Sequence, residues 1–240
     1  MDLISIVNKI SGKGTRLLFF LTILSLFCIE DNIAQTSDFS TWTRLGIQTD
    51  LGSKFELEAT GGVRFNNNSS QLDELYTELS LGFSPWKFME LGGNYRFIHN
   101  RKADGSQENL HRFDTDLKLK SEIKRFSFEY RFRLETYPIF ANENPDHEFF
   151  LRHKIGIEYD IRKCKITPNF STELFHKFRD SKADELRKLR YTAGASYKLN
   201  KSHRFELLLR YQNEMNVKEP DKDFILNLRY KFYFRQNKNN

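Results

Sequence analysis

The stretch that decides the fold covers residues 125–136 and reads RFSFEYRFRLET. Its apolar residues, which include Phe126, Phe128 and Phe132, occupy every second position, and charged residues hold most of the positions between them. Side chains of a β-strand alternate between two faces, so this stretch would have one apolar and one charged face. As a helix it would scatter both kinds of side chain around the cylinder. The alternation therefore predicts a strand with two contrasting faces.

The same alternation recurs from Phe39 onward, and turn or loop residues separate one segment from the next. Eleven alternating segments can be read, and short turns such as residues 52–54 alternate with longer polar loops. The longer loops are expected to include residues 99–109, 137–147 and 177–185. Each segment has about 11 to 13 residues, near the length that a tilted strand needs to cross a bilayer. Outer-membrane barrels have this pattern of short periplasmic turns and longer external loops.

Alternation alone does not decide which face points outward, because a soluble lipocalin-like barrel would place the apolar face inside. Three features favour lipid on the apolar side instead: a signal for export, strands of even length, and a polar face with dense charge of both signs. In lipid every backbone polar group must be paired, so an exported amphipathic sheet has to close on itself. The expected fold is all-β, a transmembrane up-and-down antiparallel β-barrel.

The expected strand number follows from the rule that bacterial single-chain barrels have even numbers of strands. We therefore expect about twelve strands, within a range of about ten to twelve. The additional strand would lie near residues 35–40 or at a weak hairpin. An N-terminus that threads through the lumen is the alternative.

The N-terminal residues 1–34 have the features of a secretory signal peptide. Three basic residues precede an apolar run over residues 17–29, and Ala34 offers a small residue at the expected cleavage point. The run is shorter than the roughly 20 apolar residues of a helical membrane span. Residues 35–240 would then form the barrel domain in the outer membrane of a Gram-negative cell. Its partners would be outer-membrane lipid and, during insertion, the barrel-assembly machinery.

Composition narrows the possible classes further. The chain has 240 residues, and 39% of them are hydrophobic. The mean hydropathy is −0.63, which would suit a soluble protein, but a membrane barrel has polar residues at every second strand position. The net charge of +6 comes from basic residues interleaved with acidic ones, so no nucleic-acid partner is expected. Cys28 lies in the predicted signal peptide, which leaves Cys164 without a disulfide partner.

Several segments also carry a family pattern. An early Trp42 precedes a short-turn hairpin, residues 108–113 read ENLHRF, and residues 126–135 read FSFEYRFRLE. Residues 151–154 read LRHK, and a further strand is expected over residues 187–197. In these features the chain resembles the DUF2490 group of outer-membrane barrel proteins, common in Bacteroidetes, over essentially all of the mature chain. The resemblance implies a barrel and supplies no catalytic residue, because the family has no established activity.

The charged face would line the lumen of such a barrel. Sixteen basic and twelve acidic positions share this face, and Glu129, Arg131, Arg133 and Glu135 form an acid–base–base–acid row. One interpretation is a salt-bridged lumen that stabilises and nearly fills the barrel. The other is a narrow, weakly anion-preferring pore. The candidate lumen-lining residues are Arg64, Glu78, Arg96, Arg112, Asp114, Asp116, Lys118, Glu129, Arg131, Arg133, Arg152, Lys154, Glu158, Arg190, Arg210 and Arg229.

The sequence thus favours a structural barrel that is closed or has a narrow pore, with a passive channel for small solutes as the alternative. A lipid-modifying enzyme is a third hypothesis, and its only catalytic candidate is His153 on the apolar face. Flanking basic residues favour salt bridges over acid–base chemistry for Asp114 and Asp116. No enzyme activity and no cofactor are expected. No metal site is expected either, because no two of His99, His111 and His147 have ligand spacing on one element.

Overall fold

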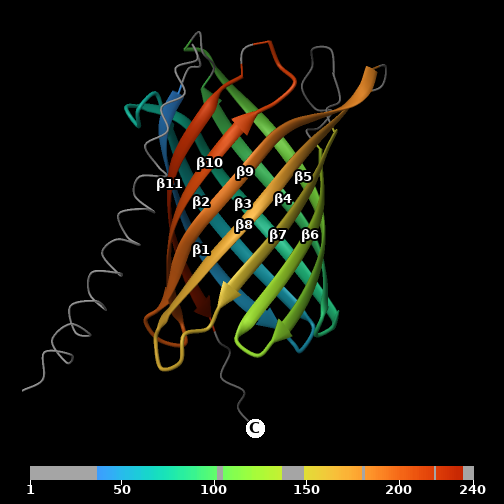
Figure 1. The fold of residues 1–240 in the computed structure, drawn as a ribbon, viewed down its shortest axis with the longest axis vertical. Helices are drawn as coiled ribbons and strands as arrows, with labels where there is room; N and C mark the ends of the chain where they lie inside the picture. Colours follow the sequence, from blue (N-terminus) through green and yellow to red (C-terminus); the bar gives the residue numbers. More distant parts are fainter. Residues whose placement is uncertain (1–36, 102–104, 137–148, 180–181, 219, 235–240) are drawn as a thin grey trace, which may run out of the picture. The chain divides into compact units, whose positions relative to one another are not determined.

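In the part of the chain that the structure describes, eleven β-strands follow one another and close into a barrel (Figure 1). Among the described residues, no helix is long and apolar enough to cross a membrane. The predicted signal peptide over residues 1–34 and the predicted loop over residues 137–147 lie outside the described part of the chain. The computed structural model describes residues 37–101, 105–136, 149–179, 182–218 and 220–234.

Each strand corresponds to one stretch of alternating apolar and polar residues. The strand that contains most of residues 125–136 is β6, and it begins after a turn in which Lys124 has a positive φ of 57°. The strands are β1 (Ser37–Leu51), β2 (Phe55–Asn66), β3 (Gln71–Trp86), β4 (Met89–Arg101), β5 (Gln107–Ile123), β6 (Phe126–Thr136), β7 (Phe149–Tyr159), β8 (Ile166–Arg179), β9 (Lys182–Lys198), β10 (His203–Glu214) and β11 (Lys222–Phe234).

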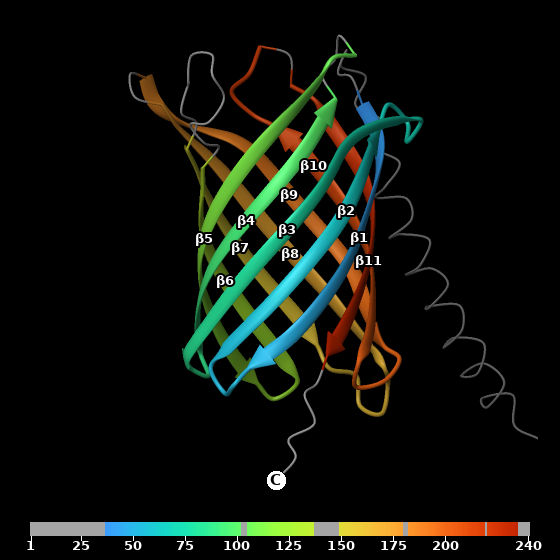
Figure 2. The same cartoon turned by 180° about the vertical axis from the view of Figure 1, so that it is seen from behind.

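The barrel closes between its first and last strands. Neighbouring strands pair antiparallel around the barrel, as expected, whereas β1 and β11 pair parallel from Ser37↔Lys222 to Thr49↔Phe234 (Figure 2). The expectation of about twelve strands is therefore wrong, because the described residues form eleven. The even-number rule assumes antiparallel closure, but a parallel pair also satisfies the backbone groups of both edges. Part of the region proposed for a twelfth strand, residues 37–40, is the start of β1.

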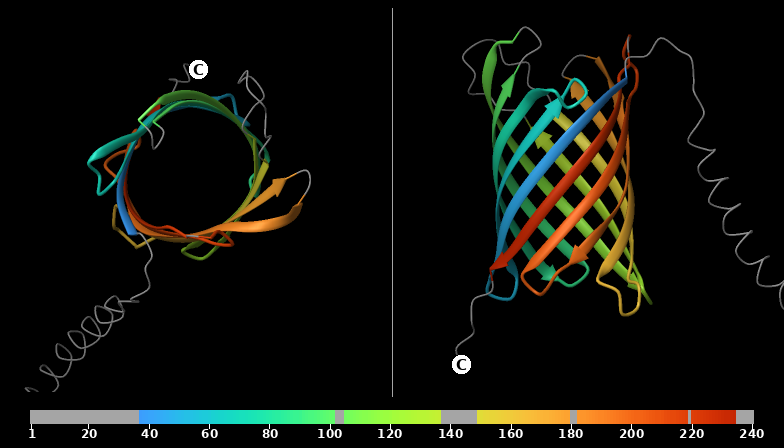
Figure 3. Two further views of the ribbon diagram at one scale, coloured as in Figure 1. Left: turned by 90° about the horizontal axis from the view of Figure 1, so that it is seen from above. Right: turned by 90° about the vertical axis from the view of Figure 1, so that its left-hand side faces the viewer.

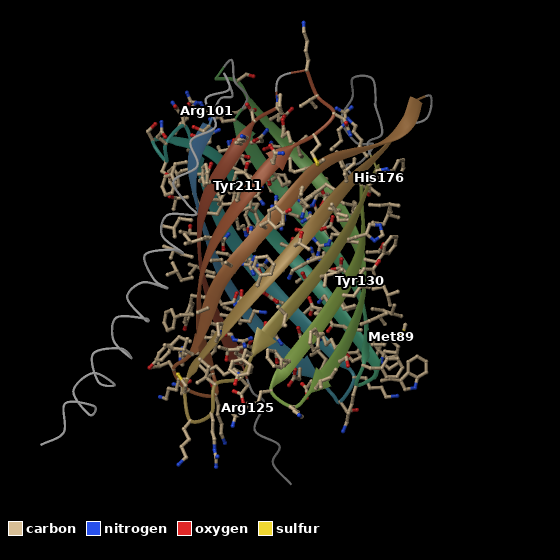
Figure 4. All side chains as sticks on the ribbon, viewed as in Figure 1. Met89, Arg101, Arg125, Tyr130, His176 and Tyr211 are labelled. Carbon is tan, nitrogen blue, oxygen red and sulfur yellow. The ribbon has the colours of Figure 1, made fainter. Side chains whose placement is uncertain are left out.

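The connections define two ends of the barrel. The turn end carries the connections β1–β2, β3–β4, β5–β6, β7–β8 and β9–β10. The loop end carries the connections β2–β3, β4–β5, β6–β7, β8–β9 and β10–β11. Arg125 lies at the turn end and Arg101 at the loop end (Figure 4).

Two of the expected long loops are shorter than predicted. Much of residues 99–109 belongs to β4 and β5, and residues 177–185 belong almost entirely to β8 and β9. Polar residues continue the ladder there, because His99 pairs with Asn109 across the strands and their side chains lie 2.8 Å apart. At the loop end the β8–β9 hairpin projects beyond the wall of the barrel (Figure 3). Polarity was therefore a poor guide to where these strands end.

The apolar face of the sheet points outward. Leu45, Leu209 and Ile155 are 64%, 62% and 60% exposed, and large apolar side chains surround the barrel (Figure 4). Aromatic side chains near the turn end pack in pairs, with 4.8 Å between the ring centroids of Phe55 and Phe83. Buried positions on the inner face are mostly polar or charged. This arrangement is the inverse of a soluble β-barrel with an apolar interior.

Candidate functional site

The interior of the barrel holds a cavity of about 1200 Å³. All eleven strands contribute side chains to its wall. The lining extends from Asn67 and Asn68 at the loop end to Ser121 and Glu122 at the turn end. A single cavity thus reaches from one rim of the lumen to the other.

A continuous series of ion pairs and hydrogen bonds runs around the wall of the lumen and includes a residue from each described strand. Lys231 of β11 pairs with Glu58 of β2 at 2.8 Å. At the other end of the series, near the loop end of the same strand β11, Gln212 of β10 donates to Asp223 at 2.7 Å. We call this series of contacts the ion-pair belt, and its members are Lys231, Glu58, Arg44, Glu78, Arg96, Arg112, Glu135, Arg152, Glu173, Arg190, Gln212 and Asp223.

Glu78 is the centre of one half of the belt. Its carboxylate lies 3.2 Å from Arg44, 2.6 Å from Arg96 and 3.8 Å from Arg112. These partners come from β1, β4 and β5, whereas Glu78 comes from β3. The Glu78 side chain is only 4% exposed, so its charge needs this degree of pairing. One carboxylate thus ties four strands together.

Glu173 is the corresponding central carboxylate in the other half of the ion-pair belt. Its carboxylate lies 2.5 Å from Arg131, 2.9 Å from Arg152 and 3.4 Å from Arg190. Three guanidinium groups therefore share one carboxylate on this side of the lumen. Arg152 also pairs with Glu135 at 2.5 Å, which connects Glu173 to the rest of the belt.

The acid–base–base–acid row of β6 pairs with neighbouring strands rather than along itself. Arg133 lies across the sheet from Asp116 and contacts it at 2.6 Å, and it also contacts Asp114 at 2.9 Å. Asp114 also accepts from Arg112 at 3.1 Å. Of the two flanking basic residues, Arg112 pairs with Asp114, whereas Lys118 pairs with Glu90. Arg133 from the neighbouring strand supplies the ion pair of Asp116.

Aromatic rings separate several of the arginines. Arg64 lies 4.2 Å from the ring centroid of Trp42 and 5.4 Å from that of Tyr76, and Arg96 lies 4.2 Å from the same Tyr76 ring. Across Trp42, Arg190 is 5.4 Å from the Trp42 ring and 4.7 Å from the Phe175 ring, which Arg152 approaches to 4.3 Å. We call this series the arginine–aromatic ladder, and its members in order are Arg96, Tyr76, Arg64, Trp42, Arg190, Phe175 and Arg152.

Gly62 makes room for one ring of the ladder. A Cβ atom added at Gly62 would lie 2.3 Å from Cζ of Tyr76, so the Tyr76 ring packs directly against the Gly62 backbone. Cation–π contact with arginine is worth about 0.5–2 kcal/mol, depending on how far the pair is removed from water. The glycine therefore fixes where Tyr76, and with it two arginines, can lie.

The structure places the sequence candidates as follows. All of the candidate lumen residues line the cavity except Asp114, which is 2% exposed and pairs with Arg112 and Arg133. Trp42, Tyr76 and Phe175 were not among the candidates, although they also point into the lumen. The sequence feature that could have identified them is an aromatic residue with a charged residue two positions before or after it in the strand, which places both on the same face.

His153 lies on the outer face and is engaged by its neighbours. Its Nδ1 lies 2.8 Å from the hydroxyl of Tyr130, and its ring centroid lies 5.2 Å from that of Phe132. Similar Tyr–His–Phe contacts occur at His111 and His203. Within the ranges that the structure describes, no group of His, Cys, Asp or Glu could hold a metal ion.

Fold and interior together define a class: an eleven-stranded β-barrel with an apolar exterior and a charged lumen. Residues 39–223 match the family described as "Protein of unknown function (DUF2490)". The chain belongs to this family. No curated protein matches the chain.

Two solved structures are similar in fold. The beta domain of the Bordetella autotransporter BrkA is 10% identical with a TM-score of 0.40, and the alignment covers 73% of this chain and 82% of that one. A porin is 11% identical with a TM-score of 0.35, and the alignment covers 72% of this chain and 56% of the porin. Neither likeness is close enough to carry information about activity.

Proposed function

We propose that this protein is an outer-membrane β-barrel whose lumen is a narrow, water-filled passage for small hydrophilic solutes. The observation that carries the proposal is the single cavity of about 1200 Å³ that is lined from the loop end to the turn end. Side chains of both signs line it, which suits hydrated polar solutes rather than apolar ones.

The exterior supports a membrane location. Exposed apolar side chains such as Leu45, Ile155 and Leu209 surround the whole barrel, far beyond the apolar patches of soluble monomers. A closed barrel also leaves no unpaired strand edge, which hydrocarbon requires. Outer-membrane lipid is therefore the proposed surrounding, and the barrel-assembly machinery is the proposed partner during insertion. We propose no nucleic-acid partner, because basic and acidic residues are interleaved inside the barrel and form no basic patch.

The ion-pair belt sets the width of the passage. Its side chains extend from every strand into the lumen, and several of them, such as Glu78 and Arg112, are at most 5% exposed. Solutes must pass between these fixed charges, so only small ones fit. We propose no catalytic role, because His153 is held by Tyr130 and Phe132 on the outer face.

A closed barrel with a purely structural or loop-presenting role is the second candidate. The same belt favours it, because ion pairs between nearby strands also hold the wall of the barrel together. The two candidates differ in one measurable property, the permeability of the lumen to ions.

Planar lipid bilayers distinguish the two candidates. The purified full-length protein should produce discrete conductance steps in potassium chloride, with a reversal potential in a salt gradient that shows a weak preference for chloride. The preference is weak because the residues that line the cavity carry only a small excess of positive charge, sixteen basic against fifteen acidic side chains. Folding is checked by a mobility shift on heating before electrophoresis. Folded protein that gives no conductance steps would contradict the passage and support the closed barrel.

A further inference from the structure

Arg210 on β10 differs from the other described arginines that line the cavity. It lines the cavity, but no carboxylate among the described residues pairs with it. Its Nε is buried and has no hydrogen-bond partner. Its guanidinium carbon lies 5.3 Å from the ring centroid of Trp42. The fork of N–H donors on Arg210 is therefore left without an acceptor.

The surroundings of Arg210 carry more positive than negative charge. Trp42 has Arg64 at 4.2 Å and Arg190 at 5.4 Å from its ring, so three guanidinium groups surround one indole. Arg190 shares its carboxylate, Glu173, with two further arginines. Arg64 pairs with Glu74 at 2.6 Å, but its Nε is also buried without an acceptor. A buried positive charge needs an anion or strong acceptors nearby.

We propose that the lumen binds an oxyanion, a carboxylate or phosphate group, at Arg210 beside Trp42. The planar arginine fork matches two oxygens of such a group and binds them through paired, charge-assisted hydrogen bonds. The indole of Trp42 forms one wall of the site, and Arg64 and Arg190 add positive potential from its other sides. If the site selects solutes, that role rests on the proposed passage. Oxyanion binding itself depends only on the arrangement of Arg210, Trp42, Arg64 and Arg190.

Trp42 provides the means of detection. The chain has two tryptophans, and Trp86 lies on the outer face with 58% exposure. The Trp86→Phe variant of the full chain therefore has Trp42 as its only tryptophan. In detergent, its fluorescence is measured during titration with sodium phosphate and, separately, with sodium acetate, at constant pH and with sodium chloride replaced to hold the ionic strength.

Either oxyanion should change the Trp42 fluorescence in a saturable way. In the same background, Arg210→Gln should weaken the apparent affinity by at least about tenfold, because the bidentate contact is lost. Arg210→Lys keeps the charge without the fork and should weaken it to a smaller extent. Arg204→Gln is the matched control, since it makes the same charge change on β10 at a residue that does not line the cavity, and it should bind normally.

Three outcomes overturn the site. The first is a fluorescence response of the Trp86→Phe protein that stays linear with oxyanion concentration, as in collisional quenching. The second is an apparent affinity of Arg210→Gln equal to that of Arg204→Gln. If Arg210→Gln does not fold, the third is an apparent affinity of Arg210→Lys equal to that of the Trp86→Phe parent. Conductance without saturable binding overturns this inference and leaves the passage standing. Saturable binding without conductance overturns the passage and leaves the site standing.

Discussion

At the scale of single residues, the packing of the lumen depends on a glycine as well as on charged side chains. Tyr76 lies against the backbone of Gly62, between Arg64 and Arg96. The neighbouring Gly61 has no atom within 4 Å of an added Cβ. Two adjacent glycines thus have different roles, because they point to opposite faces of β2.

Gly62→Ala should therefore destabilise the barrel, whereas Gly61→Ala should not. The new Cβ would displace the Tyr76 ring and weaken its stacking on both arginines, with an expected loss of about 1–3 kcal/mol in the free energy of unfolding. Urea unfolding of both variants in the same detergent measures the difference. Equal stability of the two variants would show that Tyr76 has room to move at no cost.

At the scale of strands, the barrel depends on the parallel seam between β1 and β11. Thirteen residue pairs join the two strands, among them Thr43↔Leu228 and Trp42↔Asn227. The seam places Trp42 of the first strand beside Arg190 and Arg210 of β9 and β10. Without it, the arginine–aromatic ladder would end at Trp42, and Lys231 would not reach Glu58.

Cysteines placed at a seam pair test this register directly. In a Cys164→Ser background, Thr43→Cys with Leu228→Cys should form a disulfide on oxidation, because the two residues are partners on one face. Thr43→Cys with Asn227→Cys is the control and should stay reduced, because a shift of one residue points the side chains to opposite faces. Mass spectrometry of the oxidised, digested proteins detects the cross-link. Cross-linking of the control pair alone would place the seam in another register.

At the scale of the whole molecule, the ion-pair belt connects all eleven described strands through polar and charged side chains, most of which are largely buried. The belt is uneven, because Arg131, Arg152 and Arg190 share Glu173, and of these three only Arg152 has a second carboxylate, Glu135. Removal of one partner from a buried charge network leaves the others without compensation, which is the costly case. Stability and ion preference should therefore respond together to a change at this carboxylate.

Glu173→Gln should lower the free energy of unfolding by about 3 kcal/mol or more, since three guanidinium groups lose their shared anion. If the lumen conducts, the same change should also increase the preference for chloride. Glu122→Gln at the exposed turn end is the control, with an expected change of less than about 1 kcal/mol. Urea unfolding and reversal potentials in a salt gradient measure the two effects. A Glu173→Gln protein as stable as the control would mean that the belt adds no stability.

The sequence by itself determined the strands and their faces. In residues 126–135, for example, the period of two between phenylalanines and charged residues is a local property, and it leaves no other regular structure with separated faces. The same alternation indicated which residues enter the lumen, such as Arg133 and Arg152. Strand ends were less well determined, because polar pairs such as His99 and Asn109 continue a ladder as readily as they form a loop.

Only the tertiary structure decided which charges meet and how the barrel closes. Lys231 and Glu58, or Trp42 and Arg190, lie far apart in the chain and meet because the register of every strand pair adds up around the circle. An alternating pattern is compatible with many registers and with either an even or an odd number of strands. The physical reason is that alternation arises within one strand, whereas closure and ion pairing depend on all eleven strands at once.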